Sequence, residues 1–196
     1  MKDSEIANTA QHEYWNNVAG PRWVGLGGFV ERRVRAVNDL LVARSAVAPG
    51  ENVLEIGCGT AAATVPFAEA VGERGRVVGV DISEPMLAGA RQRIAANGLG
   101  NISLVQADAQ VHRFEGTRFD LIASRFGVMF FVDPAVAFSN LLPAATCGAT
   151  GRSPMFYLLG TARGEWPLAD PPRDRLAPFG TSSAEPASSA GTVGLQ

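Results

Sequence analysis

The sequence predicts an α/β fold, a doubly wound and mostly parallel sheet with helices on both faces. Between residues 51 and 142, short apolar runs alternate with helical segments of about a dozen residues, which is typical of parallel βαβ units. A glycine or an acid follows three of these runs within two residues. In parallel sheets such strand ends meet at one edge, where ligands bind. A chain of 196 residues is long enough to bury the core of one such domain.

Four apolar runs are the predicted strands, and a fifth is weaker. The strands cover 53–56, 76–80, 102–106 and 119–124, with 152–159 as the weaker fifth. Ser83 is the expected N-cap of a helix, because Pro85 suits the first turn that follows it. The helices expected between the strands cover 61–71, 83–96 and 134–142.

The segment before the first strand is also predicted to be helical. Residues 6–18 are expected to be helical and hold Tyr14 and Trp15 among polar residues, and apolar residues recur at helical spacing over 29–47. Pro21 with the glycines around residue 27 is expected to break the chain between them. From Gly164 onward Pro, Gly, Ser and Ala dominate, which predicts a disordered tail. We therefore expect three parts: a helical segment that covers the site (1–48), the α/β domain (49–160) and the tail (161–196).

Composition excludes several classes of partner. The formal net charge of -2 disfavours a nucleic-acid partner. The longest apolar run, 126–132, is too short to span a bilayer, and the polar start of the chain has no signal-peptide pattern. The two cysteines, Cys58 and Cys147, form no CxxC pair and no histidine cluster accompanies them. We therefore expect no disulfide framework, no metal site and a cytoplasmic location.

The turn after the first strand is the most informative motif. It reads Val53-Leu54-Glu55-Ile56-Gly57-Cys58-Gly59-Thr60. Two glycines separated by one residue let the backbone approach a ligand and adopt dihedral angles that other residues avoid. A helix is expected to follow from Ala61, so that strand, turn and helix start together form a nucleotide-binding element.

Two cofactors compete for this element. The segment 57–62 satisfies G-x-G-x-x-G/A, and Asp81 lies about twenty residues further on, as an NAD site requires. Against NAD stands Glu55, whose carboxylate is expected to point toward the ligand and to repel a pyrophosphate. The sulfonium and ammonium of S-adenosyl-L-methionine suit an acid there, and Asp108 can accept a hydrogen bond from an adenine amino group. S-adenosylmethionine is therefore the favoured cofactor.

The ordered motifs resemble the class I S-adenosylmethionine-dependent methyltransferases, in particular the branch similar to ubiquinone/menaquinone-biosynthesis methyltransferases. The resemblance spans residues 53–142. Tyr14-Trp15 and the segment 20–23 resemble the leading segment of the same branch, and 124–131 is a narrower match. The motifs that carry the resemblance are 53–60, 78–83 with 86–87, 106–109 and 119–122.

The resemblance implies a Rossmann-like methyltransferase fold and a set of cofactor-binding residues. The turn would surround the methionine part, Asp81 would bind the ribose, and the end of the third predicted strand would read the adenine edge. The last two members of the set would lie under the cofactor near the substrate. The implied set is Glu55, Gly57, Cys58, Gly59 and Thr60 in the turn, Asp81, Ile82 and Met86 around ribose and adenine, Asp108 and Ala109 at the adenine edge, and Ser124 and Arg125.

The sequence departs from the family at two places. Ala61 stands where the family usually has a third glycine, and a positive φ there would weaken the cofactor site. After Leu142 the family has a Pro-Gly-Gly turn, a strong fifth strand and an antiparallel hairpin, whereas this chain continues Pro143-Ala144-Ala145 into its tail. We hypothesise that the C-terminal third is a frameshifted or truncated product of a longer gene, with incomplete closing strands. A strand and hairpin pattern in another frame of the coding DNA is the test.

The favoured function is S-adenosylmethionine-dependent methyl transfer to a small molecule. The alternatives are a non-catalytic remnant and, more weakly, an NAD-dependent oxidoreductase. The sequence has two histidines, His12 and His112, and we interpret His112 as a surface loop residue, so no catalytic residue is assigned. No Asn-Pro-Pro-aromatic run follows the fourth predicted strand, which disfavours methylation of a base amine. The residues define neither the acceptor nor the oligomeric state.

Overall fold

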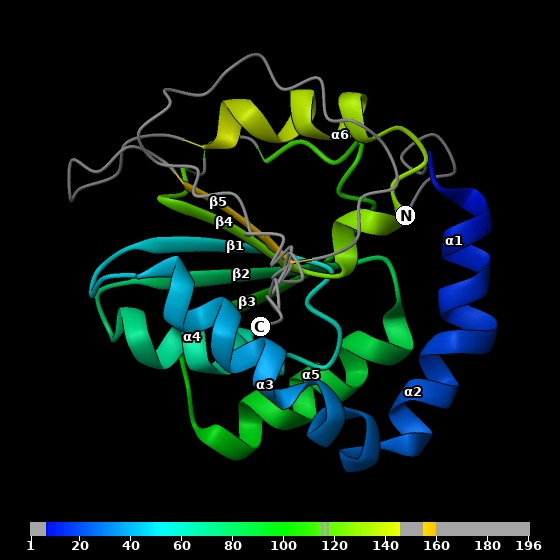
Figure 1. Ribbon diagram of the computed structural model, residues 1–196, viewed down its shortest axis with the longest axis horizontal. Helices are drawn as coiled ribbons and strands as arrows, with labels where there is room; N and C mark the ends of the chain where they lie inside the picture. Colours follow the sequence, from blue (N-terminus) through cyan, green and yellow to red (C-terminus); the bar gives the residue numbers. More distant parts are fainter. Residues whose placement is uncertain (1–6, 115, 117, 146–154, 160–196) are drawn as a thin grey trace, which may run out of the picture. The chain divides into compact units, whose positions relative to one another are not determined.

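A computed structural model describes residues 7–114, 116, 118–145 and 155–159, all within one compact unit of the chain. The predicted disordered tail and Cys147 lie outside the described residues. Five parallel strands form one sheet in the order β3-β2-β1-β4-β5 (Figure 1). The strands are β1 (Asn52–Ile56), β2 (Arg76–Asp81), β3 (Ile102–Gln106), β4 (Leu121–Arg125) and β5 (Met155–Leu159).

The strand order confirms the predicted doubly wound sheet. From β1 the chain moves outward to β2 and β3, then crosses back to β4 on the other side of β1. The reversal leaves a crevice beyond the carboxyl ends of β1 and β4, which is where ligands bind in open α/β sheets. The fifth strand starts at Met155, within the range that the sequence predicted, and pairs in parallel with β4.

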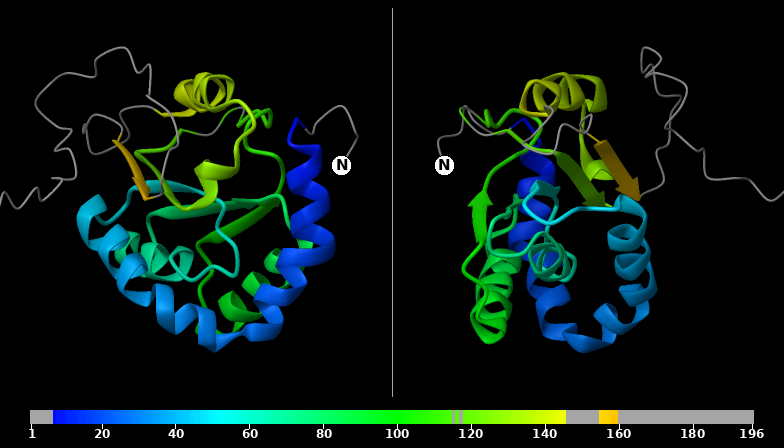
Figure 2. Two further views of the ribbon diagram at one scale, coloured as in Figure 1. Left: turned by 45° about the vertical axis from the view of Figure 1, so that its right-hand side comes forward. Right: turned by 90° about the vertical axis from the view of Figure 1, so that its left-hand side faces the viewer.

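Helices cover both faces of the sheet. In Figure 1, α6 lies on one face, and α3, α4 and α5 lie on the other. The N-terminal segment (residues 7–26) begins with α1 (Thr9–Tyr14), continues through a π-helical turn, η2 (Trp15–Ala19), and ends with α2 (Gly20–Leu26); it lies beyond the carboxyl ends of the strands (Figure 2). The remaining elements are α3 (Gly28–Ser45), α4 (Thr64–Val71), α5 (Glu84–Asn97), η3 (Gly127–Phe130), α6 (Pro134–Leu141) and η4 (Leu142–Ala144).

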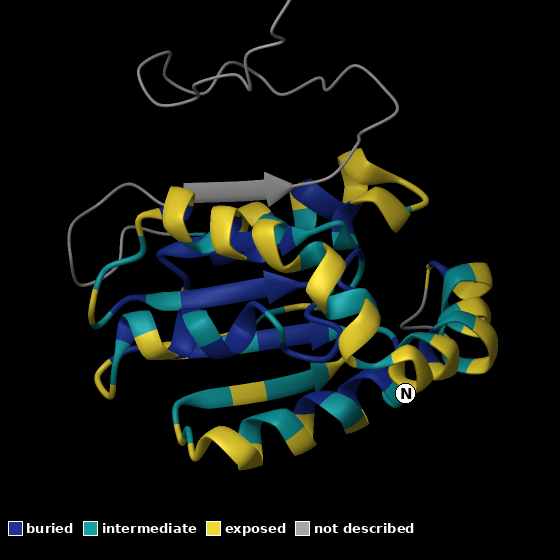
Figure 3. Ribbon diagram, turned by 60° about the horizontal axis from the view of Figure 1, so that its bottom comes forward, coloured by how far each residue is buried: buried dark blue, intermediate teal, exposed yellow. Residues whose placement is uncertain are grey.

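The core has two layers because successive strand residues face opposite sides. Leu54 and Ile122 pack toward α6 in one cluster, whereas Val53 and Leu121 pack toward α3 and α4 in the other. The central strands β1 and β4 are buried along most of their length, and the edge strand β3 is only partly buried (Figure 3). The sheet is therefore anchored at its centre, next to the crevice.

The N-terminal segment differs from its prediction. Pro21 does not break it, because the proline stands in the first turn of α2, where its missing N–H is not needed. Helical structure instead ends at Gly27, which has a φ of 45°. Gly20 brings the segment against the domain, since a Cβ at that position would lie 2.6 Å from the Ser83 hydroxyl oxygen.

The helix after the glycine turn also starts later than predicted. It was expected from Ala61 but begins at Thr64, because Gly57, Gly59 and Ala61 all have positive φ and prolong the turn. Ala61 has a φ of 61°, a conformation that disfavours residues with a Cβ. The third glycine position of the family thus keeps a left-handed backbone here. The other predicted strands and helices agree with the structure to within three residues at each end.

Candidate functional site

A cavity of about 420 Å³ lies at the carboxyl ends of the strands, between the sheet and the N-terminal segment. A second hollow, of about 480 Å³, lies at the opposite ends of β2 and β3, and none of the predicted site residues lines it. We therefore take the first cavity as the candidate site. Its walls are Asn8, Gln11, Trp15, Trp23, Ile56, Gly57, Gly59, Val80, Asp81, Ile82, Met86, Ala107, Asp108, Ala109, Arg125, Phe126, Gly127, Met129, Phe130 and Phe131.

The floor of the cavity is a close contact between two loops. A Cβ on Gly57 would lie 2.6 Å from the Gly127 Cα, so neither loop tolerates a side chain at the contact. Ser124 fixes the second loop: its hydroxyl donates to the Ile56 carbonyl at 2.8 Å and accepts from the Gly127 N–H at 3.1 Å. Ser124 is fully buried and does not line the described cavity. Its position indicates that it shapes the site rather than touching a ligand.

Asp81, at the end of β2, is a partly exposed acid on the cavity wall. Its carboxylate accepts from the Gly59 N–H at 2.8 Å and from the Ser83 N–H at 2.9 Å, one on each oxygen. Burial raises the pKa of Asp81, and these N–H groups oppose the shift. A carboxylate has about four lone-pair positions, so each oxygen can still accept a further hydrogen bond.

The carboxylate of Asp108, beyond the end of β3, accepts all its hydrogen bonds from within the protein. Its Oδ2 atom accepts from the N–H groups of Ala7 and Asn8 at 2.9 and 2.8 Å. Its Oδ1 atom accepts from the Asn8 side-chain amide at 2.7 Å and from the Gln110 N–H at 3.0 Å. These four hydrogen bonds match the capacity of a carboxylate. Asp108 lines the cavity, but its hydrogen-bonding atoms hold the N-terminal segment instead of facing a ligand unpaired.

Glu55 is oriented differently from its expectation. Within the described chain it does not line the cavity; it is 1% exposed, and its carboxylate accepts from the Thr64 hydroxyl at 2.6 Å. Burial raises the pKa of Glu55 to about 7, while the hydrogen bond and the charge of Arg125 oppose the shift. The alternation along β1 explains the orientation, because Glu55 shares a face with Val53. The Glu55 carboxylate is therefore not placed to repel a pyrophosphate in the cavity, contrary to the expectation from the sequence.

Arg125, at the end of β4, brings a positive charge to the cavity wall. Its Nε and Nη1 atoms are buried and have no hydrogen-bond partner in the part of the chain that the structure describes. Burial lowers the pKa of this guanidinium, and the acids Glu55 and Glu31 oppose the shift. Two donor atoms of Arg125 are thus buried without an acceptor among the described residues.

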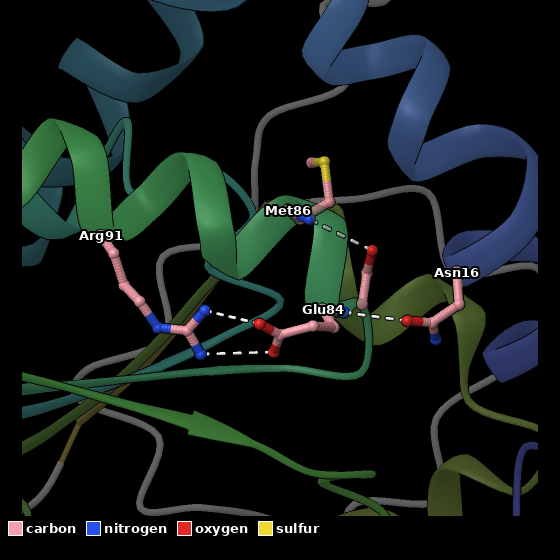
Figure 4. Close-up of polar contacts among 5 residues, drawn as sticks. Asn16, Glu84, Met86 and Arg91 are labelled. Carbon is pink, nitrogen blue, oxygen red and sulfur yellow. Dashed lines mark hydrogen bonds and ion pairs between the residues drawn. The ribbon is translucent and has the colours of Figure 1, made fainter.

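The start of α5 connects the cavity to the N-terminal segment (Figure 4). The predicted cap is present: the Ser83 hydroxyl accepts from the Met86 N–H at 3.4 Å. The Glu84 N–H donates to the Asn16 side-chain oxygen at 2.9 Å, and the Glu84 carboxylate pairs with Arg91. Met86 is buried and lines the cavity beside Ile82. The helix start therefore positions one cavity wall and anchors the segment above it.

Eight of the twelve predicted residues line this cavity, and four do not. Within the described chain Thr60 lies outside it and donates to Glu31 at 3.0 Å, and Cys58 is buried beside Gly79, where burial raises the pKa of its thiol. The cavity-lining members of the predicted set are Gly57, Gly59, Asp81, Ile82, Met86, Asp108, Ala109 and Arg125; the other four are Glu55, Cys58, Thr60 and Ser124.

The sequence prediction had the N-terminal segment cover the site but assigned none of its individual residues to the cavity. Asn8, Gln11, Trp15 and Trp23 line the cavity, although none was assigned to it. Trp15 packs edge-on against Phe130, with ring centroids 5.3 Å apart. The two tryptophans could have indicated this, since both are large aromatic residues on a segment that was expected to cover the site.

The described residues contain neither a membrane-spanning helix nor a cluster of metal ligands. No helix in the described part of the structure is long and apolar enough to cross a membrane. Among the same residues, no group of three His, Cys, Asp or Glu side chains is placed to hold a metal ion.

Comparison with known sequences identifies the domain. Residues 53–143 match the family model described as "Methyltransferase domain". Aklanonic acid methyltransferase from a Streptomyces species is 42% identical over 91 residues, which are 46% of this chain and 41% of that protein. Nocamycin O-methyltransferase of Saccharothrix syringae is 39% identical over 54% of this chain and 39% of its own length. A Bacillus cereus demethylmenaquinone methyltransferase is 43% identical over 42% of this chain and 35% of its own length.

Solved structures share the fold. Magnesium protoporphyrin IX methyltransferase from Synechocystis, with bound S-adenosylhomocysteine, has a TM-score of 0.55 and 25% identity, over 70% of this chain and 68% of that one. A Bacillus halodurans protein described as a putative methyltransferase is 29% identical with a TM-score of 0.50, over 55% of this chain and 46% of that one. The [4+2]-cyclase SpnF, at 21% identity and a TM-score of 0.51 over 56% of this chain and 40% of that one, shares the fold alone.

The fold and the cavity define a nucleotide-binding α/β protein of the Rossmann-like class. Within that class, residues 53–143 match a methyltransferase domain, and the chain is similar to the S-adenosylmethionine-dependent methyltransferases that its motifs predicted. The chain spans less than half of the length of the curated relatives that it matches.

Proposed function

We propose that this protein is an S-adenosylmethionine-dependent methyltransferase that acts on a small molecule. The observation that carries the proposal is Asp81, a partly exposed acid that lines the cavity next to the turn of Gly57 and Gly59. Its two oxygens each have one protein donor and room for another, which suits the two hydroxyls of a ribose.

The remaining walls suit the other parts of the cofactor. Ile82 and Met86 offer apolar surface next to Asp81, which supports the placement of the adenine there. Since the Asp108 carboxylate already accepts four hydrogen bonds, the proposed reader of the adenine edge shifts to Gln11, whose Oε1 is buried in the cavity wall without a partner among the described residues. A side-chain amide pairs with adenine through one acceptor and one donor.

The small size and aromatic lining of the cavity support a small-molecule acceptor. Trp15, Trp23 and three phenylalanines leave a cavity of about 420 Å³ for cofactor and acceptor together. When bound, S-adenosylmethionine supplies a methyl group already activated by the sulfonium. The contribution of the protein is then to orient the acceptor and to exclude water, and the N-terminal segment is suited to both.

The domain division, the location and the partners belong to the same proposal. Residues 1–48 would cover the site, 49–160 would bind the cofactor, and the acceptor would be a small molecule of the cytoplasm. The participation of Asn8 and Trp15 in the cavity wall supports a covering role for the N-terminal part. The buried thiol of Cys58, which is free in the part of the chain that the structure describes, fits a reducing compartment.

NAD remains a second candidate because of one specific observation. Repulsion of the NAD pyrophosphate required Glu55 to face the ligand. The Glu55 carboxylate instead faces Thr64. Asp81 after a G-x-G turn suits either cofactor. The cavity geometry therefore leaves this choice to a binding measurement, and the methyltransferase domain favours S-adenosylmethionine.

Calorimetric titration of the full chain with S-adenosylhomocysteine and with NAD is the decisive experiment. We expect binding of the first and none of the second. Saturable binding of NAD alone would contradict the proposal. Methyl transfer is then measured over a panel of phenols, enols, carboxylic acids and amines; binding without turnover on any of them would favour the non-catalytic remnant.

A further inference from the structure

The cavity contains hydrogen-bond donors that the protein does not use. The Nε and Nη1 atoms of Arg125 are buried, and they have no acceptor in the described part of the chain. The indole Nε1–H of Trp23 is likewise buried and unpaired among the described residues. Both side chains line the cavity, which is otherwise largely apolar.

The nearby acids do not neutralise Arg125 directly. The carboxylate of Glu55 accepts from Thr64 at 2.6 Å, and no described acid lies within ion-pair distance of Arg125. Glu31 accepts from Thr60 at 3.0 Å and pairs with Arg93. Buried donor atoms without a partner are energetically unfavourable, so an anion beside the guanidinium is favoured.

The wall beside Arg125 is aromatic. The guanidinium carbon lies 5.8 Å from the centroid of the Phe126 ring, and Trp15 packs against Phe130 in the same cavity. A planar fork of donors next to aromatic faces is suited to bind an anionic oxygen attached to a flat apolar group or to a short chain.

We propose that Arg125 is the anion-binding subsite of this cavity and receives a carboxylate group, with the unpaired Trp23 indole N–H as a second donor in the same cavity. The inference rests on the proposed function for its two sources of that carboxylate: the amino-acid part of the cofactor, or a carboxylate on the acceptor. In either case the ligand supplies the acceptor atoms that the protein lacks at this position.

Calorimetry on Arg125→Met separates the two sources, with Arg74→Met, an exposed arginine outside the cavity, as the matched control. The probes are S-adenosylhomocysteine, 5′-methylthioadenosine, which has no amino-acid part, and 2-naphthoate with its neutral analogue 2-naphthamide. If the cofactor supplies the carboxylate, R125M weakens S-adenosylhomocysteine by about tenfold or more and leaves methylthioadenosine unchanged. If the acceptor supplies it, R125M weakens 2-naphthoate by a similar factor and leaves 2-naphthamide unchanged.

The proposal is overturned if R125M binds all four probes as R74M does. Failure of the proposed function looks different, because the wild-type chain then binds neither adenosine compound. In that case 2-naphthoate binding still tests the subsite. Loss of 2-naphthoate binding in R125M supports the subsite, whereas a wild-type chain that does not bind 2-naphthoate refutes it. Should R125M fail to fold, Arg125→Lys keeps the charge without the fork and is expected to lose several-fold in affinity for the bound carboxylate.

Discussion

Asp81 and Asp108 occupy equivalent positions in the fold but have different roles. Each is an acid at the carboxyl end of a strand, and each lines the same cavity. Asp81 is held by N–H groups 22 and 2 residues away, so it belongs to the local structure of the turn and of α5. Asp108 is held chiefly by Ala7 and Asn8, about a hundred residues away. The first acid keeps acceptor capacity for a ligand, and the second anchors the N-terminal segment.

The difference shows that position in the fold does not define the role of an acid. What decides is how many of the four lone-pair positions the protein itself fills. Two are filled at Asp81 and four at Asp108. Glu55, at the end of β1, follows neither pattern, since it is buried with a single hydroxyl as donor. Substitutions at the three acids should therefore have three distinct effects.

The largest effect is expected at Asp81. Asp81→Asn removes the charge that would bind the ribose hydroxyls, and hydrogen bonds to charged groups contribute about 1.5–3 kcal/mol each. For two such bonds, we expect the affinity for S-adenosylhomocysteine to fall by roughly 150-fold or more, measured by calorimetry. Asp39→Asn, at an exposed acid of α3, is the matched control and should bind as the wild type does. Unchanged affinity in D81N would remove Asp81 from the cofactor site.

At Glu55 we expect an effect on stability that depends on pH. Burial raises the pKa of Glu55 from 4.5 to about 7, so the folded state disfavours the ionised form. The associated stability is fully present below pH 4.5 and is lost as the pH rises to 7, by about 3 kcal/mol at most. Glu55→Gln keeps an acceptor for Thr64 and does not ionise.

The Glu55 prediction is measured by urea unfolding of both proteins at pH 5 and pH 8. The stability of E55Q relative to the wild type should be greater at pH 8 than at pH 5. An equal difference at both would show that Glu55 does not titrate in this range.

A smaller effect is expected at Asp108. Asp108→Asn replaces an acceptor of four hydrogen bonds by a group with one acceptor oxygen, and should destabilise the protein by about 2 kcal/mol. The loss should concentrate in the N-terminal segment, seen as faster hydrogen exchange at the amide groups of Ala7 and Asn8. Asn8→Ala should resemble it, and the double variant should be less destabilised than the sum of the two. Full additivity would mean that the two side chains act independently.

The sequence predicted the sheet and the acid of β2 because both depend on local pattern. Apolar runs that end in a glycine or an acid define the strand ends, and strand ends define the ligand edge. The partner of Asp108 was not predictable in this way, because Asn8 reaches it across a hundred residues and the N-terminal segment carries no periodicity that specifies where it packs. The error at Glu55 was avoidable, since alternation along β1 places it on the face of Val53, toward α4.

The smallest expected effect concerns the turn that holds Asp81. Ala61 has a φ of 61°, and a left-handed alanine costs about 1 kcal/mol relative to glycine there, part of which is offset by the greater unfolded-state entropy of glycine. Ala61→Gly should raise the free energy of unfolding by about 0.5–1 kcal/mol, measured by urea unfolding.

The control separates strain in the turn from strain elsewhere. Ala46, which ends α3 far from the turn in sequence, has a φ of 46° and offers the same substitution. Ala46→Gly should stabilise by a similar amount and leave the affinity for S-adenosylhomocysteine unchanged. A61G should also tighten that affinity, by about twofold, because a relaxed turn holds the Gly59 N–H on Asp81 more firmly. If A61G stabilises without tightening, strain at Ala61 does not affect the position of Asp81.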